Sequence, residues 1–261
     1  MVKPRRPTQP KSRSTAHSGT TKISTSRAKP KTTESPSTPP VAVTATSRTI
    51  ARPPPDLNAL VKKTIWSADK TIHRIHPETY GANTFNPGPQ GNARFSPIID
   101  ANGISIPTIY GGTTLECAAM ETVFHDVPHE PGLKTVAKRK LKNHQYSQLQ
   151  SSTDLTLADL SSTALRKLGI PRVDLIETDK DIYPQTRKWA EAIHAQCPDV
   201  QGLEWVSRQD DRARAIILFG DRLPPDPLSS IAPSVDIVEN EDTYAALVEL
   251  AETIGVQITG K

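Results

Sequence analysis

The hydrophobic pattern is clearest over residues 183–196. Within this segment Thr186, Trp189, Ala190, Ile193 and His194 recur at helical spacing. Such a stripe predicts an amphipathic helix that packs one face on a hydrophobic core.

Shorter apolar or alternating segments predict strands and further helices around this one. We expect strands over residues 64–67, 71–76, 106–110, 152–160, 202–207, 214–219 and 256–258, and helices over 56–63, 114–125, 163–168 and 243–254. Residues 133–150 fit either a strand or a helix with an exposed face. Gly111 and Gly112 are expected to break the strand that precedes the 114–125 helix. Short strands that alternate irregularly with helices indicate an α+β fold of mixed sheets with flanking helices, not a doubly wound parallel sheet.

The first 55 residues differ from the rest of the 261-residue chain. They are rich in Pro, Ser, Thr, Lys and Arg and contain no Phe, Trp or Tyr, so they cannot bury enough apolar surface to offset the entropy of ordering. We therefore expect a disordered basic tail over residues 1–55 and one folded domain over residues 56–261.

Charge divides the chain at the same place. Eleven Lys or Arg residues and a single acid, Glu34, give residues 1–55 a charge of +10, which leaves −6 for the rest of a chain that carries +4 in total. The acidic domain is therefore not expected to bind nucleic acid directly. The tail is either passive or an electrostatic tether to nucleic acid or an acidic partner.

Several features favour a protein of the cytoplasm. The two cysteines, Cys117 and Cys197, lack the spacing of a metal site and are too few for a disulfide framework, which fits a reducing compartment. We find no apolar run of about 18 residues, so no transmembrane helix is expected. The basic first residues are not followed by an apolar segment, so no secretory signal is expected either.

Candidate chemistry gathers in four short blocks. Glu121 lies near the apolar side of the 114–125 helix, and considered alone it fits an ordinary solvated glutamate. The blocks that accompany it cover residues 73–76, 93–97 with 109–111, 118–122, and 202–209. Their order and spacing resemble the RES family, which is named for an Arg, a Glu and a Ser. The segments 159–169 and 183–190 are similar to the same family, and the resemblance covers about residues 66–223.

The resemblance assigns roles to five residues. The Arg of the name falls on Arg74, the Glu on Glu121 and the Ser on Ser207, a second family arginine falls on Arg94, and the tyrosine that ends a strand falls on Tyr110. The residue before the second arginine is usually glycine in the family and is alanine here, which is a departure from the pattern.

The family implies a fold similar to ADP-ribosyltransferases and an attack on NAD⁺. Some members cleave the nicotinamide–ribose bond by phosphorolysis or hydrolysis, and others transfer ADP-ribose to a protein. Members are toxins of bacterial toxin–antitoxin pairs, so the resemblance implies an antitoxin similar to Xre-type helix-turn-helix proteins. NAD⁺ is then a substrate, inorganic phosphate is one candidate acceptor, and no cofactor or metal is required. Oligomer formation stays open.

The residue types suit this chemistry. Cleavage passes through an oxocarbenium-like state, which the Glu121 carboxylate can stabilise while it holds ribose hydroxyls. Arg74 and Arg94 can bind a pyrophosphate through paired guanidinium contacts. Tyr110 offers a ring for stacking on nicotinamide together with a polar tip. Ser207 can bind ribose or orient Glu121.

Each of these residues also has a structural interpretation. Arg74 fits an exposed sheet position, Arg94 a partner of an acid, Tyr110 the core and Ser207 the cap of a turn. His73, His76 and His125 raise the idea of a metal site, but His-x-x-His on a strand is weak support for one. The rival interpretations of the whole protein are a protein ADP-ribosyltransferase and a catalytically silent interaction module that its basic tail tethers.

Overall fold

The computed structural model describes residues 49–128 and 130–260. Residues 1–48 of the predicted tail therefore lie outside the described part of the chain. The disorder that we expected for them stays a prediction.

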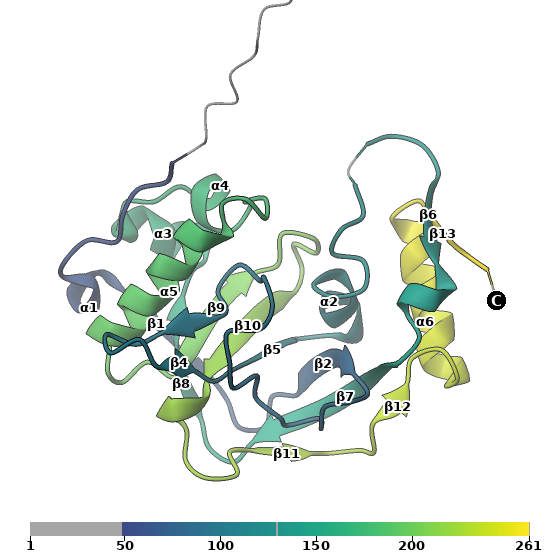
Figure 1. Cartoon of the computed structure of the whole chain (residues 1–261), viewed down its shortest axis with the longest axis horizontal. Coiled ribbons are helices and arrows are strands. Elements are labelled where there is room, and N and C mark those ends of the chain that lie inside the picture. The colour runs from purple at the N-terminus through teal and green to yellow at the C-terminus, as the bar shows by residue number, and fades with distance from the viewer. Residues whose placement is uncertain (1–48, 129, 261) are drawn as a thin grey trace, which may run out of the picture. The chain divides into compact units, whose positions relative to one another are not determined.

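A nine-stranded sheet forms the centre of the described chain (Figure 1). Its strands are β1 (Lys63–Trp66), β2 (Ile72–Pro77), β5 (Thr108–Gly112), β7 (His144–Ser151), β8 (Leu155–Asp159), β9 (Gly202–Val206), β10 (Arg214–Phe219), β11 (Leu228–Ser230) and β12 (Val235–Asp236). The order is β1-β8-β9-β10-β5-β2-β7-β11, and β12 also pairs with β7. The pairs are antiparallel except for β8 with β9, which are parallel. Two small sheets join β3 (Ile98–Ile99) to β4 (Ser105–Ile106), and β6 (Lys134–Ala137) to β13 (Val256–Thr259).

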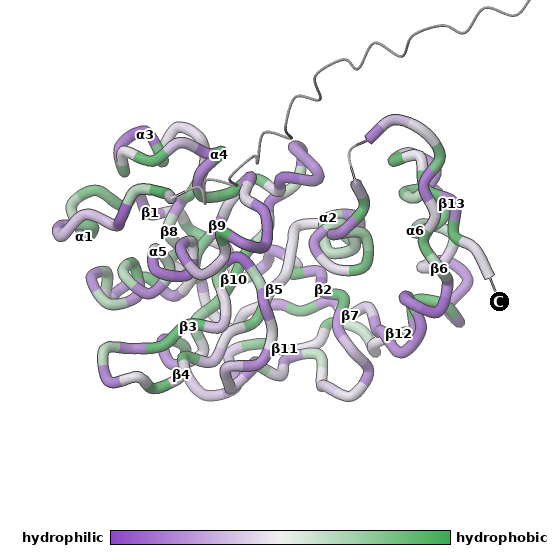
Figure 2. Tube along the Cα trace, turned by 45° about the horizontal axis from the view of Figure 1, so that its top comes forward, coloured by the Kyte–Doolittle hydropathy of each residue, from purple (hydrophilic) through white to green (hydrophobic). Residues whose placement is uncertain are grey.

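The helices form two groups (Figure 1). One group contains α1 (Leu57–Leu60), α3 (Ser162–Leu168), α4 (Arg172–Leu175) and α5 (Tyr183–Gln196), and the other contains α2 (Leu115–Met120) and α6 (Glu241–Thr253). Each group buries its own hydrophobic cluster. Figure 2 shows hydrophobic and hydrophilic residues alternating along α6, as expected for a helix that packs one face. The predicted α+β architecture of mixed sheets with flanking helices is confirmed.

Helix α5 has the predicted bounds, and all five residues of its predicted stripe are buried. The segment 133–150, which we left open, forms the two strands β6 and β7. In the described chain no helix is both long and apolar enough to cross a membrane.

Two predictions around Glu121 were wrong in detail. Strand β5 includes Gly111 and Gly112 instead of breaking there. The two glycines let the side chains of neighbouring elements pack directly on the strand, since a Cβ on Gly111 would lie 2.3 Å from Ile72 Cγ2. Helix α2 is also shorter than predicted and ends at Met120, with Glu121 as its C-cap. Residues 122–125 continue as turns, in which Phe124 N donates to the carbonyl of Ala119.

The folded part of the chain includes residues that we assigned to the tail. The Ile50 side chain is 5% exposed and belongs to the cluster under α5. The Trp189 indole donates a 2.8 Å hydrogen bond to the carbonyl of Ala51, and Gln196 donates to that of Pro54. The segment before Asp56 thus packs on α5.

Candidate active site

Helix α2 sets the position of Glu121. Thr114 caps its first turn by accepting a 3.0 Å hydrogen bond from Cys117 N. Gly112 lets α2 lie close to strand β5, since a Cβ at this position would be 2.7 Å from Cys117 Sγ. The carboxylate at the end of α2 therefore lies over the sheet, with its side chain 14% exposed.

Ser207 fixes the orientation of that carboxylate. Its hydroxyl donates a 2.7 Å hydrogen bond to Glu121 Oε1 and accepts bonds from the backbone N–H groups of Gln209 and Asp210. Arg172 Nη2 donates to the Ser207 carbonyl. Ser207 therefore both orients Glu121 and caps the turn that follows β9, which joins two interpretations that the sequence kept apart.

Arg94 lies beside the second oxygen of the same carboxylate. Its Nη1 is 4.0 Å from Glu121 Oε2, and its guanidinium lies 5.5 Å from the centre of the Tyr183 ring. The side chain is 3% exposed, and neither Nε nor Nη2 has a hydrogen-bond partner. Buried donors without partners are costly to a fold. An acceptor oxygen of a ligand that reached these two donors would supply the hydrogen bonds that the protein does not.

Tyr110 places its ring in the site but not its hydroxyl. Tyr110 Oη accepts a 3.0 Å hydrogen bond from Phe95 N, and the ring meets Trp205 edge-on. Burial raises the pKa of Tyr110 to about 12, so the phenol stays neutral. The polar tip that we expected to face a ligand is thus used by the backbone, and only the ring remains for stacking.

Arg74 occupies a different part of the site from Arg94. It belongs to β2, and its Nη1 donates to the carbonyls of Ala82 and Gly81. Burial lowers its pKa to about 10, which leaves the guanidinium charged near neutral pH. No carboxylate neutralises it in the contacts of the described residues.

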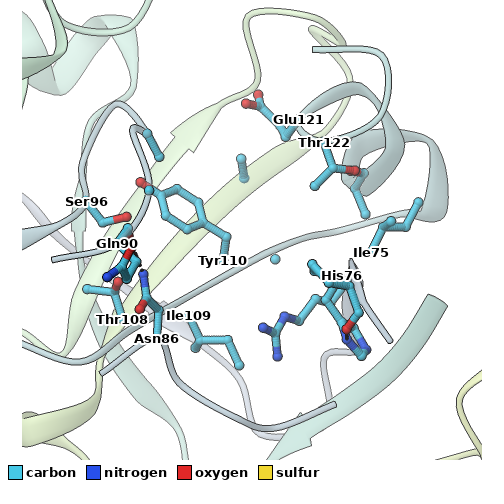
Figure 3. A pocket seen from close by; sticks show the side chains of 17 residues that line it. Ile75, His76, Asn86, Gln90, Ser96, Thr108, Ile109, Tyr110, Glu121 and Thr122 are labelled. Atoms are coloured by element: carbon cyan, nitrogen blue, oxygen red, sulfur yellow. Dashed lines mark hydrogen bonds between the residues drawn. The ribbon is translucent and has the colours of Figure 1, made fainter. Parts of the chain in front are cut away.

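Two adjoining chambers meet at Glu121. The first has a volume of about 250 Å³ and contains Arg74, and the second has about 330 Å³ and contains Arg94. Four residues line both: Ala93, Tyr110, Glu121 and Thr122. In the first chamber Glu121 and Thr122 lie at one end, and Tyr110 separates them from a polar end (Figure 3). The structure therefore gathers Glu121, Ser207, Arg94 and Tyr110, and places Arg74 further along the first chamber.

Sequence reasoning missed most of the polar lining. In the first chamber it missed Asn86, Gln90, Ser96 and Thr108, and in the second it missed Asp126, Lys180 and Tyr183. Asn86 and Gln90 lie between β2 and β3, where the sequence analysis predicted neither a strand nor a helix. The spacing of His125, four residues after Glu121, was the one available signal for the second chamber.

The three histidines that suggested a metal lie with separate partners. His73 Nδ1 is 2.6 Å from the Tyr146 hydroxyl, and His76 Nε2 is 2.8 Å from Ser147 Oγ. Across residues 49–128 and 130–260, no three His, Cys, Asp or Glu residues are grouped as metal ligands would be.

Comparison with known proteins identifies the family and supports the fold. The chain matches the RES domain over residues 71–239, and it therefore belongs to the RES domain family. No protein in the curated set matches it. Among solved structures it is similar to a chain in the crystal structure of the M. tuberculosis MbcT-MbcA toxin-antitoxin complex, with a TM-score of 0.55 and 18% identity. That similarity covers 76% of this chain and 95% of the other, and at such low identity it supports the fold alone.

Proposed function

We propose that this protein is an NAD⁺-degrading toxin of a toxin–antitoxin pair, which cleaves the nicotinamide–ribose bond by phosphorolysis or hydrolysis. The observation that carries the proposal is the carboxylate of Glu121, which Ser207 orients and Arg94 flanks, at the junction of two chambers. Membership of the RES domain family supports it.

A single carboxylate suffices for this reaction. Ordinary glycosidases use two carboxyl groups, one of which protonates the leaving group. Nicotinamide is bound to ribose as a pyridinium and leaves as a neutral base, so the leaving group needs no proton. Glu121 then has one task, to stabilise the positive charge that develops on the ribose and to hold its hydroxyls.

The two arginines would bind the dinucleotide from opposite sides of the junction. Arg74 offers its charged guanidinium in the first chamber, and Arg94 offers two unpaired donors in the second. Guanidinium groups suit the oxygens of a pyrophosphate. The exposed face of the Tyr110 ring would stack on the nicotinamide.

An antitoxin partner follows from the proposed activity. A cytoplasmic enzyme that consumes NAD⁺ would arrest the cell that makes it unless another protein blocks the cleft. The similar solved chain was crystallised in a toxin-antitoxin complex, which supports a partner of this kind. The resemblance in sequence implies an Xre-like protein, so any contact with DNA would come through the partner.

The test is NAD⁺ consumption by the purified wild-type protein and by Glu121→Ala, each with and without phosphate, with the products resolved. Glu116→Ala, an exposed glutamate of the same helix, is the matched control. We expect loss of NAD⁺ with wild type and with the control, and a loss at least about 100-fold slower with Glu121→Ala. Label transferred from NAD⁺ to a host protein would favour a protein ADP-ribosyltransferase. Wild-type protein that leaves NAD⁺ intact in all conditions would favour a silent interaction module.

A further inference from the structure

The second chamber holds a row of polar groups that the proposed function does not use. The segment after Glu121 contributes His125 and Asp126. Tyr183 is the first residue of α5, and Lys180 lies three residues before it. These side chains lie on the wall of the chamber that Glu121 and Arg94 also line.

The four groups form a continuous chain of contacts. Lys180 Nζ is 2.8 Å from Asp126 Oδ1, which is 2.9 Å from His125 Nδ1, and His125 Nε2 is 3.1 Å from the Tyr183 hydroxyl. A carboxylate only accepts, so Nδ1 of the neutral imidazole carries the proton and donates it to Asp126. His125 Nε2 then holds a lone pair and accepts from the hydroxyl of Tyr183.

The surroundings of Asp126 and Tyr183 favour an ionised carboxylate and a protonated phenol. Hydrogen bonds from Lys180 and His125 hold the pKa of Asp126 below its usual range, so it is a carboxylate at neutral pH. Burial raises the pKa of Tyr183, so the phenol keeps its proton in the resting protein. Arg94, Arg208, Lys180 and Glu121 are the charged groups that act on Tyr183, and Gln209 donates to the His125 carbonyl from the turn after β9.

A carboxylate, an imidazole and a hydroxyl in this order can move a proton. In the Ser-His-Asp arrangement the carboxylate fixes the tautomer of the imidazole, which takes a proton from the hydroxyl. Here a phenol takes the place of the serine, and the phenol is in the wall of the chamber rather than at the reacting carbon. The phenol would therefore relay a proton from a third group to His125.

We propose that the Asp126–His125–Tyr183 chain activates a water molecule in the second chamber and thereby sets how much NAD⁺ is hydrolysed rather than phosphorolysed. This inference rests on the proposed function. As the water oxygen bonds to the ribose carbon, the carbon–nitrogen bond breaks and its electron pair leaves with neutral nicotinamide. The water proton passes to Tyr183 Oη, and the phenol proton passes to His125 Nε2. The products are ADP-ribose, nicotinamide and one proton held as imidazolium, which solvent then removes.

Phosphate does not need this help. Near pH 8 inorganic phosphate is mainly a dianion, whose oxygen attacks without giving up a proton. Water must lose a proton as it attacks, and general-base catalysis of such a step contributes about 10²–10⁴-fold. Substitutions in the Asp126–His125–Tyr183 chain should therefore slow hydrolysis much more than phosphorolysis.

The test measures ADP-ribose and its 1″-phosphate from labelled NAD⁺ with and without phosphate. The variants are His125→Gln, Tyr183→Phe and Asp126→Asn, the last at a side chain that is 67% exposed. His144→Gln and Tyr244→Phe are matched controls, because neither residue lines either of the two chambers that meet at Glu121. We expect His125→Gln and Tyr183→Phe to slow hydrolysis at least about 100-fold while phosphorolysis changes less than about 3-fold.

Other results would overturn the inference. Equal loss of both products in all three variants would show that the Asp126–His125–Tyr183 contacts only support the structure. Unchanged rates of both reactions would show that these residues have no part in the reaction. Wild-type protein that forms the 1″-phosphate when phosphate is present but forms no ADP-ribose when phosphate is left out would also exclude the role. Wild-type protein that consumes no NAD⁺ at all would overturn the proposed function itself, and the inference with it.

Discussion

Ser207 and Glu121 are 86 positions apart in the chain, and the Ser207 hydroxyl donates a 2.7 Å hydrogen bond to Glu121 Oε1. The serine directly follows strand β9 and the glutamate is the C-cap of helix α2, and hydrogen bonds to the Ser207 hydroxyl hold the two positions together. Groups held in this way need no rearrangement when charge develops in a transition state.

Ser207→Ala should lower kcat for NAD⁺ cleavage by about 10–100-fold, because a hydrogen bond to a charged group contributes about 1.5–3 kcal/mol. Ser229→Ala, at an exposed serine of β11, is the control and should leave kcat unchanged. Steady-state kinetics of the two variants check the prediction. A Ser207→Ala protein with wild-type kcat would show that the bond does not act in the reaction.

Arg94→Met should weaken NAD⁺ recognition while leaving the free protein as stable as wild type or more so. Arg94 is buried with two unpaired donors, so an apolar side chain of similar length removes their desolvation cost, and the contact with Glu121 that it gives up is a long one of 4.0 Å. We expect kcat/KM to fall about 10–100-fold and Tm to stay equal or rise. The control is Arg212→Met, at a side chain that is 92% exposed. A clear drop in Tm would instead identify Arg94 as a structural residue.

Gly111→Ala should destabilise the protein by about 1–3 kcal/mol, because the added Cβ would meet Ile72 Cγ2 at 2.3 Å and the His73 carbonyl at 3.2 Å. Gly88→Ala is the control, since nothing lies within 4 Å of its added Cβ, and we expect a change within about 0.5 kcal/mol. Chemical denaturation measures both values. Equal stabilities would show that β2 and β5 can move apart freely.

The free energy of unfolding should fall as the pH is lowered from 7 to 5. Burial lowers the pKa of His73 and of His76 below the ordinary 6.5, so the unfolded chain binds more protons than the folded protein in this range. The stability that the neutral rings contribute is present above pH 6.5 and is lost as the pH falls. Denaturation curves at several pH values should show a flatter dependence for His76→Gln than for the wild-type protein. The same slope in both proteins would contradict this account.

A chain that begins at Asp56 should be less stable than one that begins at Thr49. Removal of residues 49–55 exposes the pocket of Ile50 and leaves the Trp189 indole without its acceptor on Ala51. Burial of one such side chain contributes about 1.5–3 kcal/mol, which corresponds to a fall in Tm of about 5–10 °C. Thermal unfolding of the two truncated proteins checks this. Equal Tm values for the two truncated proteins would place the domain boundary at residue 56.

The sequence by itself determined the class of the fold and singled out the four residues that lie together around the Glu121 carboxylate. Helix α5 is recognisable because its apolar stripe follows a local period, and β10 because its apolar run is continuous. The RES resemblance singled out Glu121, Ser207, Arg94 and Tyr110, and the structure brings these four together.

Only the tertiary structure decided what each residue can do. It showed that the Tyr110 hydroxyl is used by the backbone, that Arg74 and Arg94 line different chambers, and that β5 runs through its two glycines. It also joined His125 to Tyr183, which is 58 positions away. Periodicity along a chain reports which face of an element is buried, because burial repeats with the local geometry. Hydrogen bonds and chambers depend on which elements are neighbours in space, and the sheet order that sets those neighbours is not encoded in any local period.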